Sequence, residues 1–186
     1  IAPGWGAWDD KLTLLDVCGS ILIRALLEAS YDVVLRPHHM TRKKCPQLLD
    51  ELYREFARYP NFLHEENMAS TTSFYDADVL ISDWSGVTYE FAFGTEKPVI
   101  FMDIPLKVNN KNYREFNLEP IDIKIREQLG MIVNPRDALN IKEAVQDLLN
   151  NKEMYRDRII RARNEHVFNF GSSSEKGVAY IKKLLD

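Results

Sequence analysis

The chain has 186 residues, which suits one large domain, and its composition of 45% hydrophobic and 28% charged residues excludes a disordered or fibrous protein. Its 24 lysines and arginines against 28 aspartates and glutamates give a net charge of −4, so we expect no nucleic-acid partner. No apolar run approaches the roughly 20 residues that a membrane-spanning helix needs.

Cys18 and Cys45 lack metal-type spacing and are predicted to be packing residues, so we expect no metal and no cofactor. The chain begins at Ile1 without a methionine and is expected to be part of a longer protein.

Short apolar runs alternate with longer helical patterns, which is typical of repeated βα units and predicts a parallel sheet. In chain order the predicted elements are an extended stub at 1–3, a helix over 14–30, a strand over 32–36, a helix over 46–59, a strand over 61–64, a helical turn over 71–75, a strand over 78–82, a helix over 87–93 that ends at Gly94, a strand over 98–101, a long polar loop over 103–122, a weak strand over 130–133 and helices over 137–150, 153–165 and 174–185. The loop is too long for a simple connection, so we predict a lid or substrate loop. The expected fold class is α/β: residues 1–186 form a single domain with a doubly wound, Rossmann-like parallel sheet of about six strands and helices on both faces.

The passage from the strand over 78–82 into the next helix is the clearest candidate site. A helix that begins at the carboxyl edge of a parallel sheet offers amide N–H groups and a positive dipole end to an anion. Ser85 and Thr88 would add hydroxyl donors, and Gly86 would let a phosphate oxygen approach the backbone. The same residues also suit an ordinary helix N-cap at Ser85 with Asp83 as a turn former, and the pattern alone leaves both readings open.

Two other segments are candidate contacts for the same ligand. Arg36-Pro37-His38 follows the second strand, and with no acidic neighbour in the sequence it predicts a small cationic pocket for a phosphate. The adjacent His39 is predicted to be a solvated loop residue. Ser172 and Ser173 precede the last helix, where they could contact a ligand or simply cap that helix.

Taken together and in order, these segments resemble a known family. They are Ala2-Pro3-Gly4-Trp5, Arg36-Pro37-His38, residues 77–87 with Glu90-Phe91, residues 97–101 and residues 171–175. The series is similar to the C-terminal domain of the CDP-glycerol glycerophosphotransferases, the teichoic acid polymerases and primases, which have the two-domain GT-B fold of glycosyltransferases. The resemblance covers nearly the whole chain.

The resemblance implies that this domain binds a nucleotide-activated donor, either CDP-glycerol or a nucleotide sugar. His38 would contact and stabilise the donor phosphate as the catalytic residue, and Ser85 with Gly86 would seat the pyrophosphate. Ser172 or Ser173 would help to close the pocket. The donor site as a whole would comprise Arg36, His38, Asp83, Ser85, Gly86, Thr88, Ser172 and Ser173.

The resemblance also implies partners that this sequence does not contain. The general base and the acceptor, a lipid-linked or polymer acceptor of the cell wall, would belong to an N-terminal domain. This chain alone would therefore bind the donor without turning it over. The family implies a cytoplasmic location, peripheral to the inner face of the membrane.

Two departures from the family pattern leave the donor open. The family usually has R-P-H-P where this chain has His39, and a D-Y-S-S type junction where it has Asp83-Trp84-Ser85-Gly86. Ser85-Gly86-Val87 with Glu90 is also similar to the junction of UDP-GlcNAc 2-epimerases, which share the GT-B architecture. A nucleotide-sugar enzyme of that kind and a non-catalytic nucleotide-binding module remain alternatives.

Overall fold

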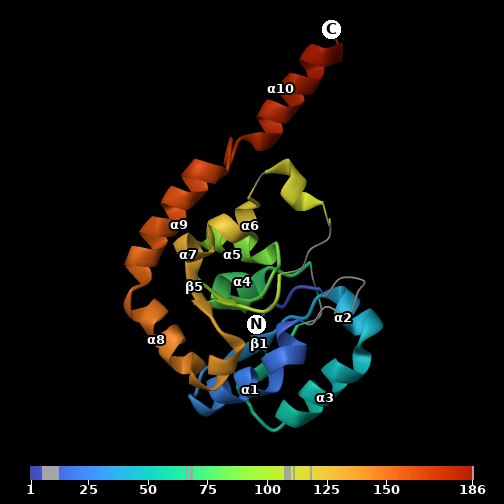
Figure 1. Ribbon diagram of the computed structural model, residues 1–186, viewed down its shortest axis with the longest axis vertical. Coiled ribbons are helices and arrows are strands. Elements are labelled where there is room, and N and C mark those ends of the chain that lie inside the picture. The colour runs from blue at the N-terminus through green and yellow to red at the C-terminus, as the bar shows by residue number, and fades with distance from the viewer. Residues whose placement is uncertain are drawn as a thin grey trace.

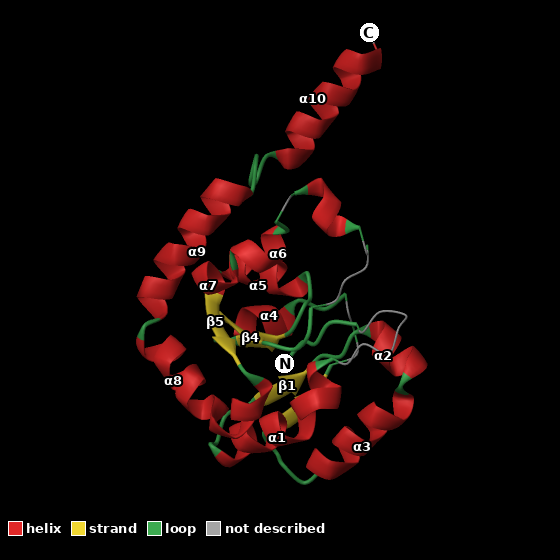
Figure 2. Ribbon diagram, viewed as in Figure 1, coloured by secondary structure: helices red, strands yellow, loops and turns green. Residues whose placement is uncertain are grey.

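The computed structural model describes residues 1–5, 13–65, 67, 69–106, 110, 112–117 and 119–185. Its strands are β1 (Val33–Leu35), β2 (Phe62–His64), β3 (Leu80–Ser82), β4 (Val99–Met102) and β5 (Gly130–Val133). Its helices are α1 (Leu14–Glu28), α2 (His39–Lys44), α3 (Pro46–Phe56), α4 (Thr72–Asp76), α5 (Val87–Thr95), α6 (Ile121–Lys124), α7 (Arg126–Leu129), α8 (Ile141–Asn150), α9 (Lys152–His166) and α10 (Ser173–Leu185), with short 3-10 helices η1 (Tyr113–Phe116) and η2 (Pro135–Asn140). The strands lie at the centre and the helices surround them (Figure 1, Figure 2).

The strands are all parallel, but they form two sheets, β1–β2 and β3–β4–β5. The prediction of one sheet with about six strands was therefore wrong in its count: the structure has five strands, and the first extended segment is not one of them. That segment nevertheless joins the two sheets. The amino group of Ile1 donates to the Val34 carbonyl at 2.7 Å, the Arg36 amide donates to the Ile1 carbonyl at 2.8 Å, and the Ala2 amide donates to the Ile81 carbonyl at 3.0 Å.

With this segment in the middle, the order of extended segments is β2, β1, residues 1–2, β3, β4 and β5. Numbered along the chain, that is the order 3-2-1-4-5-6 of a doubly wound, Rossmann-like fold. The predicted fold class is confirmed. All carboxyl ends of the strands lie at one edge, which we call the carboxyl rim.

Two separate cores cover the two faces of the sheet, as alternate residues of the strands show. Ile81, Ile100 and Met102 belong to a core with α1, α3 and α8. Leu80, Val99 and Phe101 belong to another core with α5, α7 and α9. Because successive strand residues point to opposite faces, a sheet buried on both faces needs the continuous apolar runs that β3 and β4 have.

Several helices differ from those predicted. Helix α5 continues through Gly94 and ends at Thr95, followed by the C-cap Glu96, whose φ of 60° is left-handed. Helix α2 covers the polar segment after His38, which was predicted to be a loop. The predicted long loop over 103–122 contains η1 and the beginning of α6, and its residues 107–109, 111 and 118 lie outside the described residues.

Candidate functional site

The candidate site lies on the carboxyl rim, where β1 leads to His38 and β3 leads to Ser85. Residues 1–5 connect these two places. The Gly4 amide donates to Asp83 Oδ1 at 2.7 Å, and the ring of Trp5 stacks on that of His38 with 6.4 Å between centroids. The structure therefore brings the two strongest sequence candidates to one side of the sheet.

Asp83 is buried, and its carboxylate is engaged by the protein itself. Besides Gly4, it accepts the backbone amide of Leu14 at 2.9 Å, which is the first residue of α1. A carboxylate at that position satisfies an amide that a helix leaves without an intrahelical acceptor and interacts favourably with the helix dipole. Asp83 thus positions the segments around the site, which is more than the turn-forming role that the sequence suggested.

The start of α5 offers hydrogen-bond donors in the direction of open space. Within the part of the chain that the structure describes, the Ser85 hydroxyl and the amides of Gly86 and Val87 donate to no protein acceptor. A side chain added at Gly86 would meet no atom of the described residues within 4 Å, so the space beside Gly86 is open. One hydroxyl and two amides at a helix start are suited to an anion.

Thr88, predicted to add a hydroxyl donor for the ligand, has a protein partner for that hydroxyl. Its side chain is buried, and its hydroxyl donates to the Ser85 carbonyl at 2.7 Å. The hydroxyl therefore fixes the first turn of α5. The N-cap of α5 is Gly86 and not Ser85, so the alternative of an ordinary N-cap at Ser85 does not hold.

His38 is held in one orientation by the backbone that follows it. It is the N-cap of α2, and its Nδ1 accepts the Met40 amide at 3.2 Å. In the neutral imidazole this leaves the proton on Nε2, which makes Nε2 a donor. The ring of the exposed His39 lies 4.3 Å from that of His38.

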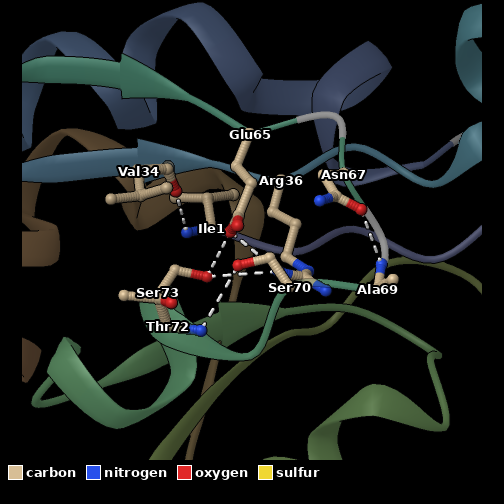
Figure 3. Close-up of polar contacts among 9 residues, drawn as sticks. All are labelled: Ile1, Val34, Arg36, Glu65, Asn67, Ala69, Ser70, Thr72 and Ser73. Atoms are coloured by element: carbon tan, nitrogen blue, oxygen red, sulfur yellow. Dashed lines mark hydrogen bonds and ion pairs between the residues drawn. The ribbon is translucent and has the colours of Figure 1, made fainter.

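Arg36, predicted to help form a cationic pocket for a phosphate, is buried and has protein partners. Its buried guanidinium forms an ion pair with Glu65 at 2.7 Å and a hydrogen bond with Ser73 at 3.3 Å (Figure 3). It also lies over the Phe74 ring, 4.8 Å from its centre. The prediction considered only neighbours in sequence, whereas the acidic partner comes from the end of β2. Since Glu65 follows a strand that ends at the same rim, the predicted topology itself could have identified it.

The ionisation of Glu65 supports this pairing. Burial by itself would raise the pKa of Glu65, but hydrogen bonds from Ser70, Ser73 and Arg36 outweigh it and hold the pKa below its usual value. The carboxylate is therefore ionised at neutral pH and compensates Arg36. The pair fixes the base of the Arg36-Pro37-His38 segment against β2.

Ser172 and Ser173 lie on the turn between α9 and α10, and both hydroxyls donate to the Asn169 carbonyl, at 3.4 and 2.8 Å. Helix α10 projects away from the rest of the molecule and has no buried residue (Figure 1). The hydroxyls therefore hold the turn that precedes α10. Their predicted contact with the donor stays a prediction.

Sequence reasoning missed Trp84 and Arg126. The indole of Trp84 donates to the Ile104 carbonyl at 2.8 Å, and the guanidinium of Arg126 lies 4.1 Å from the centre of the Trp84 ring. Arg126 lies beyond the long polar loop, where no pattern indicated a link to the rim. Among the described residues there is also no group of three or more histidine, cysteine, aspartate or glutamate side chains that could hold a metal ion.

Comparison with known proteins gave one match. Residues 12–183 match the family model described as CDP-Glycerol:Poly(glycerophosphate) glycerophosphotransferase. No curated protein and no solved structure matches the chain. In the described part of the chain, none of the helices has both the length and the apolar character needed to cross a membrane.

Proposed function

The chain belongs to the CDP-glycerol:poly(glycerophosphate) glycerophosphotransferase family, and from this premise we propose that its carboxyl rim binds the diphosphate of CDP-glycerol. The observation that carries the proposal is the open start of α5, with the Ser85 hydroxyl and the Gly86 and Val87 amides available as donors. A diphosphate oxygen needs such donors. The family is one of transferases, which agrees with this chemistry.

In the proposed reaction, a hydroxyl oxygen of the acceptor attacks the phosphorus that carries the glycerol. A new phosphorus–oxygen bond forms, the bond to the bridging oxygen breaks, and CMP leaves. Donors at the start of α5 would stabilise the negative charge that develops on CMP, and Nε2–H of His38 would donate to a phosphate oxygen. The attacking hydroxyl loses its proton to a general base, which we place in a separate acceptor domain.

This division of labour gives the chain the donor-binding role of a GT-B enzyme. The acceptor would be a growing poly(glycerophosphate) or a lipid-linked cell-wall precursor, as in teichoic acid synthesis, met at the cytoplasmic face of the membrane. The chain by itself is expected to bind the donor without turnover. The proposed anion site is local and needs no broad basic surface. It is therefore compatible with the chain's net charge of −4.

Calorimetric titration with CDP-glycerol, CDP, UDP, GDP, UDP-GlcNAc and cytidine tests the proposal. We expect CDP-glycerol and CDP to bind and cytidine to bind much more weakly. Ser85→Ala and His38→Ala should each weaken CDP binding roughly tenfold or more, since a charge-assisted hydrogen bond is worth about 1.5 to 3 kcal/mol.

Ser174→Ala is the control, because this exposed serine lies on α10, a helix that has no buried residue. It should bind CDP as the unchanged chain does. Binding of UDP-GlcNAc without CDP-glycerol would instead indicate a nucleotide-sugar enzyme. Failure to bind any nucleotide would overturn the proposal.

A further inference from the structure

Arg126 is a buried cation whose charge is compensated only in part. Its side chain is 4% exposed, and its ion pair is a 3.2 Å contact with Asp103, whose own side chain is 52% exposed. Within the described part of the chain, its Nε and Nη2 have no hydrogen-bond partner. A buried charge is costly unless it is well paired, and water screens a half-exposed partner.

The contrast with Arg36 shows how incomplete this compensation is. Arg36 is 6% exposed, but its carboxylate partner Glu65 is 19% exposed, lies at 2.7 Å and is itself held by Ser73. The cation that the sequence assigned to the phosphate site is thus well compensated, whereas Arg126 is not. A buried ion pair of this kind is weak evidence for a stabilising role. The presence of Arg126 therefore calls for another explanation.

The position of Arg126 supplies this explanation, because the residue lies next to the start of α5. Its guanidinium lies 4.1 Å from the centre of the Trp84 ring, and Trp84 directly precedes Ser85. It also lies 5.0 Å from the ring of Phe101, which pairs in register with Ser82 at the end of β3.

The first turn of α5 meets the same region. The Tyr89 hydroxyl donates to the carbonyl of Asp122 at 3.2 Å, four residues before Arg126. Burial and Asp122 raise the pKa of Tyr89, and the positive charge of Arg126 acts in the opposite direction.

We infer that Arg126 supplies the positive charge of the donor-phosphate site, acting from behind Trp84 on a diphosphate bound at Ser85, Gly86 and Val87. The inference rests on the proposed function and assigns its missing cation. Arg126 is a positioning and electrostatic residue rather than a catalytic one, since its nitrogens are sealed from solvent. A low-dielectric path between buried charge and ligand makes such an interaction stronger than the same charges would have in water.

The test compares CDP, inorganic pyrophosphate and cytidine as ligands for the unchanged chain and three variants. Arg126→Met keeps the volume and removes the charge, so we expect CDP and pyrophosphate affinity to fall on the order of tenfold while cytidine affinity and the melting temperature hold. Arg126→Lys keeps the charge and should retain most of the CDP affinity. Asp103→Asn removes the compensating charge and should tighten CDP and pyrophosphate binding.

Several results would overturn the inference. These are unchanged CDP affinity in Arg126→Met, an equal loss of CDP and cytidine binding, or no effect of Asp103→Asn. If Arg126→Met does not fold, the Arg126→Lys and Asp103→Asn variants decide. An unchanged chain that binds pyrophosphate but no CDP would overturn the proposed nucleotide alone, and one that binds neither would overturn both proposals.

Discussion

The carboxylate of Asp83 accepts the backbone amide of Leu14 across 69 residues of chain, at 2.9 Å, and so joins the end of β3 to the beginning of α1. The other carboxylate oxygen accepts the amide of Gly4. One side chain thereby holds three segments together at the carboxyl rim. Removal of this side chain should affect stability before it affects any ligand.

Asp83→Ala is expected to lower the free energy of unfolding by about 3 kcal/mol, because it leaves two amides without their charged acceptor. Urea denaturation measures the change. Asp78→Ala is the control, since Asp78 is exposed near the beginning of the same strand. It should stay within about 0.5 kcal/mol of the unchanged chain. Equal losses in the two variants would contradict this role for Asp83.

Glu65→Gln should destabilise the fold by about 2 to 3 kcal/mol at neutral pH, because it leaves Arg36 buried without its counter-charge. The folded-state pKa of Glu65 is lowered from 4.5, so its contribution is present above that pH and is lost as the pH falls through the lower folded value. The difference between Glu65→Gln and the unchanged chain should therefore shrink in acid.

Thermal unfolding from pH 7 to pH 3 tests this pH dependence. Glu51→Gln, at an exposed position on α3, serves as the control and should differ little from the unchanged chain at any pH. A gap for Glu65→Gln that is constant down to pH 3 would show that the carboxylate's ionisation does not stabilise the fold.

Gly130→Ala should be strongly destabilising. A β-carbon at Gly130 would lie 1.7 Å from the carbonyl oxygen of Val99, a backbone atom of the neighbouring strand, so β4 and β5 would have to separate. We expect a loss of about 3 kcal/mol. Gly94→Ala is the matched control: it has open space in the helix α5 and should stabilise by about 0.5 to 1 kcal/mol. Comparable melting temperatures for the two variants would contradict the packing of β5.

The two thiols should differ in reactivity. Cys18 is buried, its pKa is raised to about 11 by burial and by Asp83, and its thiol donates to the Leu14 carbonyl at 3.5 Å. Cys45 is only half-buried, between α2 and α3. We expect one fast and one slow reaction with a thiol reagent at pH 8, and mass spectrometry should assign the fast one to Cys45. Two equal rates would rule out the difference in burial.

The sequence allowed the prediction of β3, β4 and their helices because both faces of these strands are buried, which requires continuous apolar runs. Helix α2 was missed because its sequence, HMTRKK, has no apolar period, and its start depends on a hydrogen bond to His38. The start of α5 was found from the order of strand, serine and glycine. The order of residues along the chain does not show which residues from distant segments contact this site.

Charge was the least predictable part of the candidate site. Arg36 looked like a phosphate ligand because nothing near it in sequence is acidic, yet Glu65 reaches it from 29 residues away. Arg126 gave no signal at all, since its relation to Trp84 depends on how the segment after β4 returns to the rim. Compensation of buried charge is a property of the packed structure, so a linear pattern cannot reveal it.

Ile1 and Ala2 supply the backbone hydrogen bonds between the two sheets, so the middle of the molecule depends on this extended segment. If that segment withdrew, Val34, Arg36 and Ile81 would present unpaired carbonyl and amide groups along two parallel edges. Such edges pair readily with strands of other molecules. Displacement of Ile1 and Ala2 would thus expose two unpaired strand edges in the middle of the sheet. Self-association of the protein is the expected consequence.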